Sequence, residues 1–322
     1  MRNFAHVNAT SLDQATEMLR RYGKSAAVIA GGTDLLGKMK DEILQTYPEA
    51  LINIKSIPGL DGVAAKDDEL SIGALMRLAD IAENDTIIER YPALAEAARR
   101  TASTHLREMG TIGGNISQDI RCWYYRNPNN RFPCLRKGGG RCYAIEGDNR
   151  YHSIFGGSVE KGCYAVHPSD IAPALVALDA TIRTTKRNLR IEDFFLVLPT
   201  RTIVLDFDEI VTEIILSPPD GKSAFMKFAL RKAIDFPIVN CAAMIAVSRK
   251  KVTSARICLN AVYVKPYRAF KAEKAIIGKT INEASAEAAG AAGVSDAEPM
   301  THNAYMVPIA KTMIKRAILG CA

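Results

Sequence analysis

The stretch AAVIAGGTDLL, residues 26–36, determines how the first part of the chain is interpreted. Its first five residues are small or apolar and indicate a short strand, and its last leucines begin a helical pattern. Gly31-Gly32-Thr33-Asp34 stands between them. Two glycines let consecutive backbone N–H groups converge, and a helix start adds positive potential, so this turn suits a pyrophosphate. A tight structural turn that needs positive φ could have the same sequence, and the pattern is not the GxGxxG of nicotinamide-binding domains.

A second diglycine segment, Thr111-Ile112-Gly113-Gly114-Asn115, has the same character. Each segment is entered from an apolar residue and left through a polar one. One such turn is common and can be purely structural. Two of them favour a shared extended ligand, such as a dinucleotide with a phosphate bridge and a ring system. His105, shortly before the second segment, could approach a flavin ring.

The regions around the diglycine segments predict an α+β fold. Ser11 and Gln14 form a capping box for a first helix that ends at Gly23. The segment Ser217-Pro218-Pro219-Asp220-Gly221 predicts a domain boundary. Further strands are expected at 51–54, 70–74, 180–184, 241–247 and 255–262. Further helices are expected at 78–82, 93–100, 170–178, 267–277, 282–292 and 304–319.

Four of the seven cysteines fall in an irregular section rich in Gly, Asn and Arg: Cys122, Cys134, Cys142 and Cys163. Their spacing contains no C-x2-C pair, so it does not identify a metal as zinc or as an iron–sulfur cluster. The other three, Cys241, Cys258 and Cys321, are expected to be inert, the first two as small apolar residues in strands.

The same section carries much of the positive charge. Residues 121–150 hold seven Arg and Lys against two acidic residues, a local charge of +5 within the chain's +7. Basic side chains could offset the charge of four metal-bound thiolates. Interleaved with Trp123, Tyr124 and Tyr125, they could instead bind nucleic acid. A solvated basic loop is the simplest alternative.

The composition narrows the functional classes. A chain of 322 residues, 48% hydrophobic and 24% charged, is globular and long enough for two or three domains. No apolar run reaches the roughly 18 residues of a membrane span. The first residues have no apolar core typical of a signal peptide, so a cytoplasmic location is expected. Hydrolase motifs such as GxSxG and HExxH are absent, and no residue of the chain is expected to be catalytic.

Three motifs in this order carry a resemblance to a known family: residues 30–35, residues 111–115, and PSDIAPALVALDA at 168–180. The chain resembles, over nearly its whole length, the FAD-binding subunit of molybdenum hydroxylases of the xanthine dehydrogenase family. The resemblance implies a two-part FAD-binding domain of the vanillyl-alcohol-oxidase (PCMH) type at 1–217 and a smaller C-terminal α+β flavoprotein domain at 222–322. Lys227, followed by Arg231 and Asp235, resembles the start of that second domain.

About forty extra residues separate the second and third motifs and contain the four cysteines. An insertion of this kind, here about 118–165, is similar to those of aldehyde oxidoreductases and 4-hydroxybenzoyl-CoA reductases. The resemblance implies that Cys122, Cys134, Cys142 and Cys163 bind an additional [4Fe–4S] cluster. The long interval before Cys163 is more similar to the aldehyde oxidoreductase arrangement, so the reductase type is the alternative.

The resemblance also implies which residues bind FAD. The first motif would surround the pyrophosphate with backbone amides, the second would pass close to the flavin, Asp170 would accept a hydrogen bond from a polar part of FAD, and Lys227 would lie near the ring. The residues so implied are Ala27, Val28, Ile29, Ala30, Gly31, Gly32, Thr33, Asp34, Leu35, Thr111, Gly113, Gly114, Asn115, Asp170 and Lys227.

The function implied is electron transfer. FAD would pass electrons between the [2Fe–2S] clusters of a small partner subunit and an external acceptor, while a substrate reacts at a molybdopterin on a large partner subunit. A higher oligomer of that heterotrimer is compatible with the sequence. Similarity to periplasmic enzymes implies co-export on a partner's twin-arginine signal as the alternative to a cytoplasmic location. Neither nucleic acid nor a membrane is an expected partner. The alternative from another class is a zinc-stapled nucleic-acid-binding protein that uses the basic aromatic section.

Overall fold

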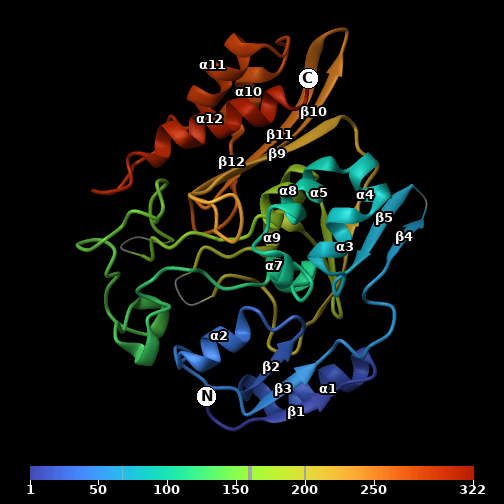
Figure 1. Cartoon of the computed structure of the whole chain (residues 1–322), viewed down its shortest axis with the longest axis vertical. Helices are drawn as coiled ribbons and strands as arrows, with labels where there is room; N and C mark the ends of the chain where they lie inside the picture. The colour runs from blue at the N-terminus through green and yellow to red at the C-terminus, as the bar shows by residue number, and fades with distance from the viewer. Residues whose placement is uncertain (67, 159–161, 199–200) are drawn as a thin grey trace.

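Three β-sheets follow one another along the molecule (Figure 1). The computed structural model describes residues 1–66, 68–158, 162–198 and 201–322. The N-terminal sheet lies at one end, a five-stranded sheet with most of the short helices lies in the middle, and the C-terminal sheet with its helices lies at the other end. Such layering of mixed sheets and helices is the α+β class predicted from the sequence.

The N-terminal sheet is parallel, with the strand order β1-β3-β2. The Ser11 hydroxyl caps its first helix, accepting a hydrogen bond from Gln14 N–H at 3.1 Å, and the helix stops at Gly23 as predicted. The Gln14 side chain accepts from Thr10 N–H at 2.7 Å instead of from Ser11, so the predicted capping box is formed only in part. The diglycine turn follows the carboxyl end of β2. The elements are β1 (Ala5–Asn8), α1 (Leu12–Tyr22), β2 (Ala26–Ile29), α2 (Leu35–Lys40) and β3 (Ala50–Asn53).

The middle sheet is antiparallel, with the strand order β4-β5-β8-β6-β7. Its strands are β4 (Val63–Lys66), β5 (Glu69–Gly73), β6 (Thr181–Thr184), β7 (Asn188–Arg190) and β8 (Val211–Leu216). The helices around it are α3 (Leu78–Glu83), α4 (Asp85–Arg90), α5 (Pro92–Arg99), α6 (Thr104–Arg107), α7 (Ile112–Ile116), α8 (Ile171–Ala177) and α9 (Ile191–Phe194).

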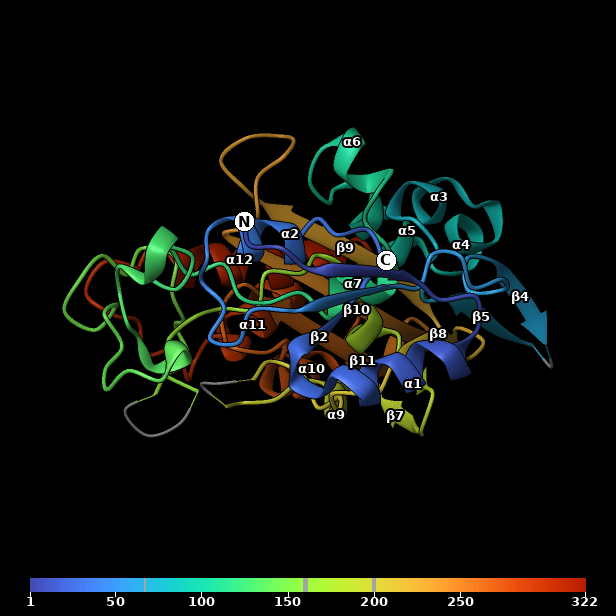
Figure 2. The same cartoon turned by 90° about the horizontal axis from the view of Figure 1, so that it is seen from below.

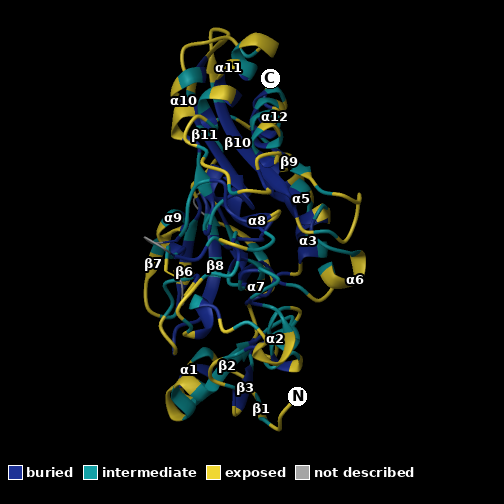
Figure 3. Ribbon diagram, turned by 90° about the vertical axis from the view of Figure 1, so that its left-hand side faces the viewer, coloured by how far each residue is buried: buried dark blue, intermediate teal, exposed yellow. Residues whose placement is uncertain are grey.

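The C-terminal sheet is antiparallel, with the order β12-β11-β10-β9, and both of its faces are covered (Figure 3). In β10, Cys241 and Ala243 pack with the C-terminal helices, whereas Ala242 and Met244 join the core of the middle region. The elements are β9 (Lys222–Phe228), β10 (Val239–Ser248), β11 (Lys251–Asn260), β12 (Tyr267–Arg268), α10 (Phe270–Ile276), α11 (Glu283–Gly293) and α12 (Met306–Leu319). The sequence break at 217–221 therefore lies between two sheets that share one hydrophobic core.

Residues 118–165 are called the cysteine loop below, and its described residues, 118–158 and 162–165, extend to one side of the molecule (Figure 2). In its described part, the regular structure consists of two 3-10 turns, Pro128–Asn130 and Leu135–Lys137. This agrees with the irregular section expected from the sequence. Among the described residues, no helix combines the length and the apolar character needed to cross a membrane.

Candidate functional site

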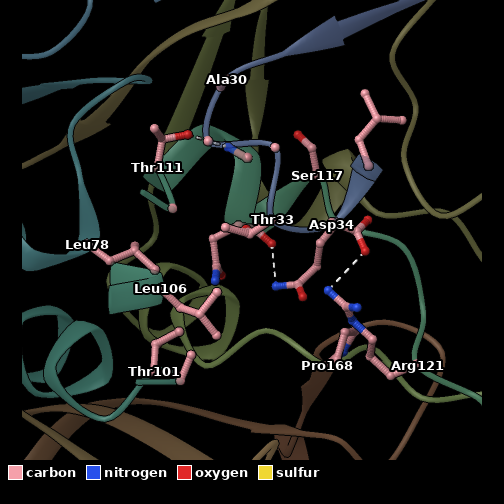
Figure 4. A pocket seen from close by; sticks show the side chains of 18 of the residues that line it. Ala30, Thr33, Asp34, Leu78, Thr101, Leu106, Thr111, Ser117, Arg121 and Pro168 are labelled. Carbon is pink, nitrogen blue, oxygen red and sulfur yellow. Dashed lines mark hydrogen bonds and ion pairs between the residues drawn. The ribbon is translucent and has the colours of Figure 1, made fainter. Parts of the chain in front are cut away.

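A cavity of about 470 Å³, called the diglycine cavity, opens at the carboxyl end of β2 (Figure 4). It lies between the N-terminal sheet, the start of α7 and the loop before β10. Thirteen of the fifteen residues predicted for the cofactor line it, and Gly113 and Lys227 do not. The predicted residues on the wall are Ala27, Val28, Ile29, Ala30, Gly31, Gly32, Thr33, Asp34, Leu35, Thr111, Gly114, Asn115 and Asp170.

The two glycines of the first turn have different structural reasons. Gly32 has a φ of +71°, a left-handed conformation that a side chain disfavours. At Gly31, a Cβ would lie 2.0 Å from the carbonyl oxygen of Met109. Gly31 therefore lets the turn touch the segment before Thr111, so this glycine serves contact within the protein and not only access for a phosphate. The expectation from the sequence, that Gly31 only lets backbone N–H groups converge on a phosphate, is thereby corrected.

The backbone amides of this turn have no internal partners. In the part of the chain that the structure describes, the N–H groups of residues 31–34 donate no hydrogen bond, and all four residues line the cavity. Successive free N–H groups before a helix start, beside a cavity, fit an anionic ligand. The residues present therefore fit a pyrophosphate.

The second diglycine segment is not a turn of the same kind. Thr111 caps the short helix α7, its hydroxyl accepting from Gly114 N–H at 3.2 Å, and both glycines lie inside this helix with negative φ. A Cβ on Gly113 would lie 2.9 Å from Ala74, so Gly113 permits close packing on the middle region. The expectation of two equivalent turns is wrong, since a capping threonine made the second one helical.

Asp34 turns toward the cysteine loop (Figure 4). Its carboxylate lies 2.9 Å from Arg121 Nη2 and 2.7 Å from Arg126 Nη2, and it accepts a hydrogen bond from Asp119 N–H at 2.9 Å. Burial opposes ionisation of Asp34, but the charges of Lys38 and the two arginines outweigh it and lower its pKa. Asp34 thus carries a negative charge and ties the turn to the loop.

Asp170 and Lys227, both predicted for the cofactor, pair with each other. Their Oδ2 and Nζ atoms are 2.6 Å apart, and both side chains are buried. Lys227 also donates to the Arg100 carbonyl at 2.9 Å, and Asn240 donates to Asp170 at 2.7 Å. Burial raises the pKa of Asp170, and the Lys227 ammonium opposes that change. The pair joins the start of α8 to β9 at the border of the cavity.

Some wall residues were missed by the sequence reasoning. Leu106 lines the cavity, whereas His105 beside it is exposed and does not. Arg121 and Phe236 lie next to each other on the wall, with the guanidinium 4.9 Å from the ring centre. Their only sequence signals were proximity to Cys122 and to the Arg231 motif. The remaining missed residues are Lys38, Leu78, Thr101, Ala102, Gly110, Ser117, Gln118, Pro168, Ile234 and Asp235.

The four predicted metal ligands line one small cavity of the cysteine loop. Cys122, Cys134, Cys142 and Cys163 all border it, together with Ile120 and Tyr125. Within the described ranges, no three His, Cys, Asp or Glu side chains are arranged to hold a single metal ion. Four-cysteine ligation of a cluster does not require one shared ion, because each thiolate binds a different iron. The convergence of the four thiols on one cavity fits a polynuclear centre.

Two of the thiols, those of Cys134 and Cys163, are buried, and a histidine nitrogen lies beside Cys122. Burial raises the pKa of Cys122, and it raises the pKa of Cys163 to about 11. His152 is buried, its Nε2 lies 3.3 Å from Cys122 Sγ, and burial lowers its pKa to about 4. A neutral His152 can therefore donate an N–H to a Cys122 thiolate.

Of the seven basic residues at 121–150, four lie inside the protein or in ion pairs at its diglycine turn, whereas Arg131, Arg141 and Arg150 are exposed. Arg136 and Lys137 are buried, and Lys137 Nζ donates to the Asn127 carbonyl at 3.5 Å. Arg121 and Arg126 are engaged with Asp34. This arrangement favours the interpretation in which positive charge offsets a buried anionic centre over that of an open basic surface.

Comparison with known proteins matches two consecutive parts of the chain to two families. Residues 2–219 match the family described as the FAD binding domain in molybdopterin dehydrogenase. Residues 224–321 match the CO dehydrogenase flavoprotein C-terminal domain. The chain is 35% identical over 255 residues to the aldehyde oxidoreductase FAD-binding subunit PaoB of Escherichia coli, covering 76% of each chain.

Other relatives extend the similarity to the whole chain. The carbon monoxide dehydrogenase medium chain of Hydrogenophaga pseudoflava is 27% identical over 313 residues, covering 96% of this chain and 93% of that one. A solved structure of carbon monoxide dehydrogenase from the same organism superimposes with a TM-score of 0.78 at 25% identity, covering 99% of this chain and 97% of the other. The chain therefore belongs to the FAD-binding subunits of the molybdenum hydroxylase and CO dehydrogenase medium-chain family, and it is an oxidoreductase subunit.

Proposed function

We propose that the chain is the FAD- and [4Fe–4S]-containing electron-transfer subunit of a heterotrimeric molybdenum hydroxylase. It would pass electrons between the [2Fe–2S] clusters of a small partner and an external acceptor. The substrate would be oxidised at a molybdopterin on a large partner. The observation that carries the proposal is the pair of neighbouring sites: a cavity lined by free backbone amides and a small cavity bordered by four cysteines.

The diglycine cavity would hold FAD. The N–H groups of residues 31–34 would bind the pyrophosphate, and residues 27–30 would form the adjoining wall. Thr111, Asn115 and Asp170 would border the part of the cofactor farther along the cavity. When bound, FAD supplies the exchange between two-electron and one-electron transfer. The task of the chain's own residues is to bind the cofactor, orient it and limit access of water.

The polar residues at the border of this cavity are held by contacts within the protein. Lys227 and Asp170 hold each other at 2.6 Å, and Ser169 is hydrogen-bonded to Asn115. Held in this way, Asp170 and Asn115 present oxygen atoms at a defined place on the wall. Lys227, behind Asp170, balances the charge of that carboxylate on this side of the cavity.

The four cysteines would bind a [4Fe–4S] cluster. Their thiols converge on one cavity that Tyr125 and Ile120 also line. Thiolates are the form that binds iron, so loading the site displaces the thiol protons. Arg136 lines the same cavity and offsets negative charge there.

The names of the relatives support the substrate class and the partners. PaoB is a subunit of an aldehyde oxidoreductase, and a relative from Sulfolobus acidocaldarius, 27% identical over 284 residues, is a glyceraldehyde dehydrogenase medium chain. A medium chain is part of an assembly with other chains. Oxidation of an aldehyde, or of an aromatic or heterocyclic compound, is accordingly the reaction that we propose for the complex.

Cofactor analysis of the full chain, purified without oxygen, tests both sites. We expect one FAD and about four irons per chain, the content of one four-cysteine cluster. Cys134→Ser should remove the iron, whereas Cys258→Ala, which alters a buried cysteine of β11 outside the loop, should retain it. Iron that is absent from the wild type, or unaffected by Cys134→Ser, would refute the cluster site. Co-purification of one large and one small chain from the native host tests the complex.

A further inference from the structure

The diglycine turn and the cysteine loop are joined by partly buried ion pairs. Asp34, the last residue of the turn, contacts Arg121 and Arg126 of the loop at 2.9 and 2.7 Å. The Asp34 side chain is 17% exposed and that of Arg126 is 15% exposed, so this is not a surface contact. Ion pairs with so little solvent around them are strongly affected when one partner moves away.

A second carboxylate, that of Asp119 in the cysteine loop, belongs to the same group of contacts, which is called the junction below. Asp119 N–H donates to Asp34 Oδ2, and the Asp119 carbonyl accepts from Arg126 Nη2 at 3.1 Å. Lys38 of α2 lies between the two carboxylates, 3.7 Å from Asp34 and 3.6 Å from Asp119. Tyr125 donates to Asp119 at 2.6 Å, which links the junction to the wall of the cysteine cavity. The junction thus reaches from α2, directly after the diglycine turn, to a residue that borders the thiols.

Arg121 connects the two sites most directly. It precedes Cys122 in the chain, and it lines the diglycine cavity. A further cavity of about 500 Å³ is also lined by both Arg121 and Cys122, and it shares Phe236 with the diglycine cavity. The place of Arg121 on the cavity wall therefore depends on the place of Cys122.

The loop has little regular secondary structure with which to hold this arrangement. The regular structure of its described part is two 3-10 turns, and side-chain contacts hold the rest, such as the Trp123 Nε1 donation to the Asp148 carbonyl at 3.1 Å and the packing of Trp123 against Tyr151. Long irregular segments of compact domains usually need a specific constraint. A metal centre that joins residues 122, 134, 142 and 163 would supply one, because metal-binding free energy becomes folding free energy.

We propose that metal loading of the cysteine loop sets the affinity of the diglycine cavity for FAD, with Asp34 as the positioning residue that couples the two sites. This inference rests on the proposed function, since it takes the cluster and FAD as the two ligands. The metal centre fixes Arg121 and Arg126, and these hold Asp34 and the turn whose amides face the cofactor. By linkage, bound FAD strengthens metal retention by the same factor.

The test is FAD affinity, followed by flavin fluorescence, in the full chain with and without iron. Iron is removed from the wild type with a chelator and restored by anaerobic reconstitution. We expect iron removal to weaken FAD binding by a factor of about 5–150, the usual range of such coupling, and reconstitution to restore it. Circular dichroism of the iron-free chain checks that the three sheets are retained.

Variants separate coupling from general damage. Asp34→Asn should weaken FAD binding in the iron-loaded chain and remove the dependence on iron, so that Asp34→Asn with Cys134→Ser binds FAD no worse than Asp34→Asn alone. Asp34→Glu should restore part of the coupling. Asp296→Asn is the matched control, because Asp296 is an exposed carboxylate that pairs with Lys271 far from both cavities.

The outcomes are distinguishable. An FAD affinity that stays the same with and without iron, or losses that simply add in the double variant, would overturn the coupling while the proposed function stands. A wild-type chain that takes up no iron on reconstitution would overturn the proposed cluster, and the coupling with it.

Discussion

The diglycine cavity and the cysteine cavity are built by opposite means. The first lies among strands and helices whose backbone hydrogen bonds fix the wall, with glycines where segments touch. The second lies in a loop without strands in its described part, where thiols, aromatic rings and buried arginines meet. The wall of the first site is formed by regular structure, whereas under the proposed function the second site would be completed by its metal centre. The expected effects below separate these two kinds of construction.

The largest effect is expected from Lys227→Met, which leaves the Asp170 carboxylate buried without its cation. Breaking such a pair costs about 3–5 kcal/mol of unfolding free energy. Urea denaturation should show this loss equally in iron-loaded and iron-free chains, because the pair belongs to the preformed side. Lys271→Met, at an exposed pair, should cost no more than about 1 kcal/mol. A loss for Lys227→Met confined to the iron-loaded chain would contradict the distinction between the two regions.

Gly31→Ala is expected to be the next most severe change. The new Cβ would lie 2.0 Å from the Met109 carbonyl oxygen, so one backbone segment must move. Overpacking of this kind costs about 1–3 kcal/mol, and FAD retention should fall because the turn is displaced. Gly37→Ala, in α2 with open space around it, should instead stabilise the chain by about 0.5–1 kcal/mol. Full FAD content in Gly31→Ala would show that the turn tolerates displacement.

His152→Leu tests the cysteine side. Removing the nitrogen 3.3 Å from Cys122 Sγ removes a hydrogen-bond donor to a thiolate. Groups that support metal ligands in this way typically change metal affinity by about 10–100-fold, and the reduction potential of the centre should become more negative. A redox titration followed by electron paramagnetic resonance measures it. His167→Leu is the control, since that buried ring contacts Asn260 and Phe195 instead. Equal shifts in both variants would point to general loosening.

The smallest effect is expected from lowering the pH. The pKa of Asp34 in the folded chain lies below its ordinary value of 3.8, so its ion pairs contribute stability above that pH. This contribution is lost as the pH falls below about 4 and the carboxylate takes up a proton. Flavin fluorescence measures the release of FAD as the pH is lowered. This release should begin at a higher pH in the wild type than in Asp34→Asn, because the variant has no carboxylate to protonate at position 34. Identical profiles for the two proteins would show that Asp34 does not contribute.

Local patterns in the sequence predicted the fold well. Ser11 and Gln14 set the start of α1, the apolar run at 26–29 became β2, and the alternation at 70–74 became β5. The family is confirmed by both family matches. The diglycine turn was predicted because strand, glycines and helix are adjacent in the chain.

The site was predictable only where its residues are close in sequence. Nothing local indicates that Asp34 pairs with Arg126, because ninety-two positions separate them. The contact of Gly31 with Met109 depends on how α6 places its following segment. The helix α7 was missed because two glycines suggested a turn, although Thr111 is a good cap. Contacts between distant segments decide these features.

The core shared by the middle region and the C-terminal sheet limits how the chain can be divided. Phe225 of β9, with Ala242, Met244 and Cys258, packs into the same apolar cluster as residues of α5 and α8. A chain truncated at Pro218-Pro219 would expose that cluster to water as a large hydrophobic surface, and such surfaces drive aggregation. Expression of residues 1–217 or 222–322 alone should therefore yield insoluble protein, although the sequence at 217–221 predicts a domain boundary.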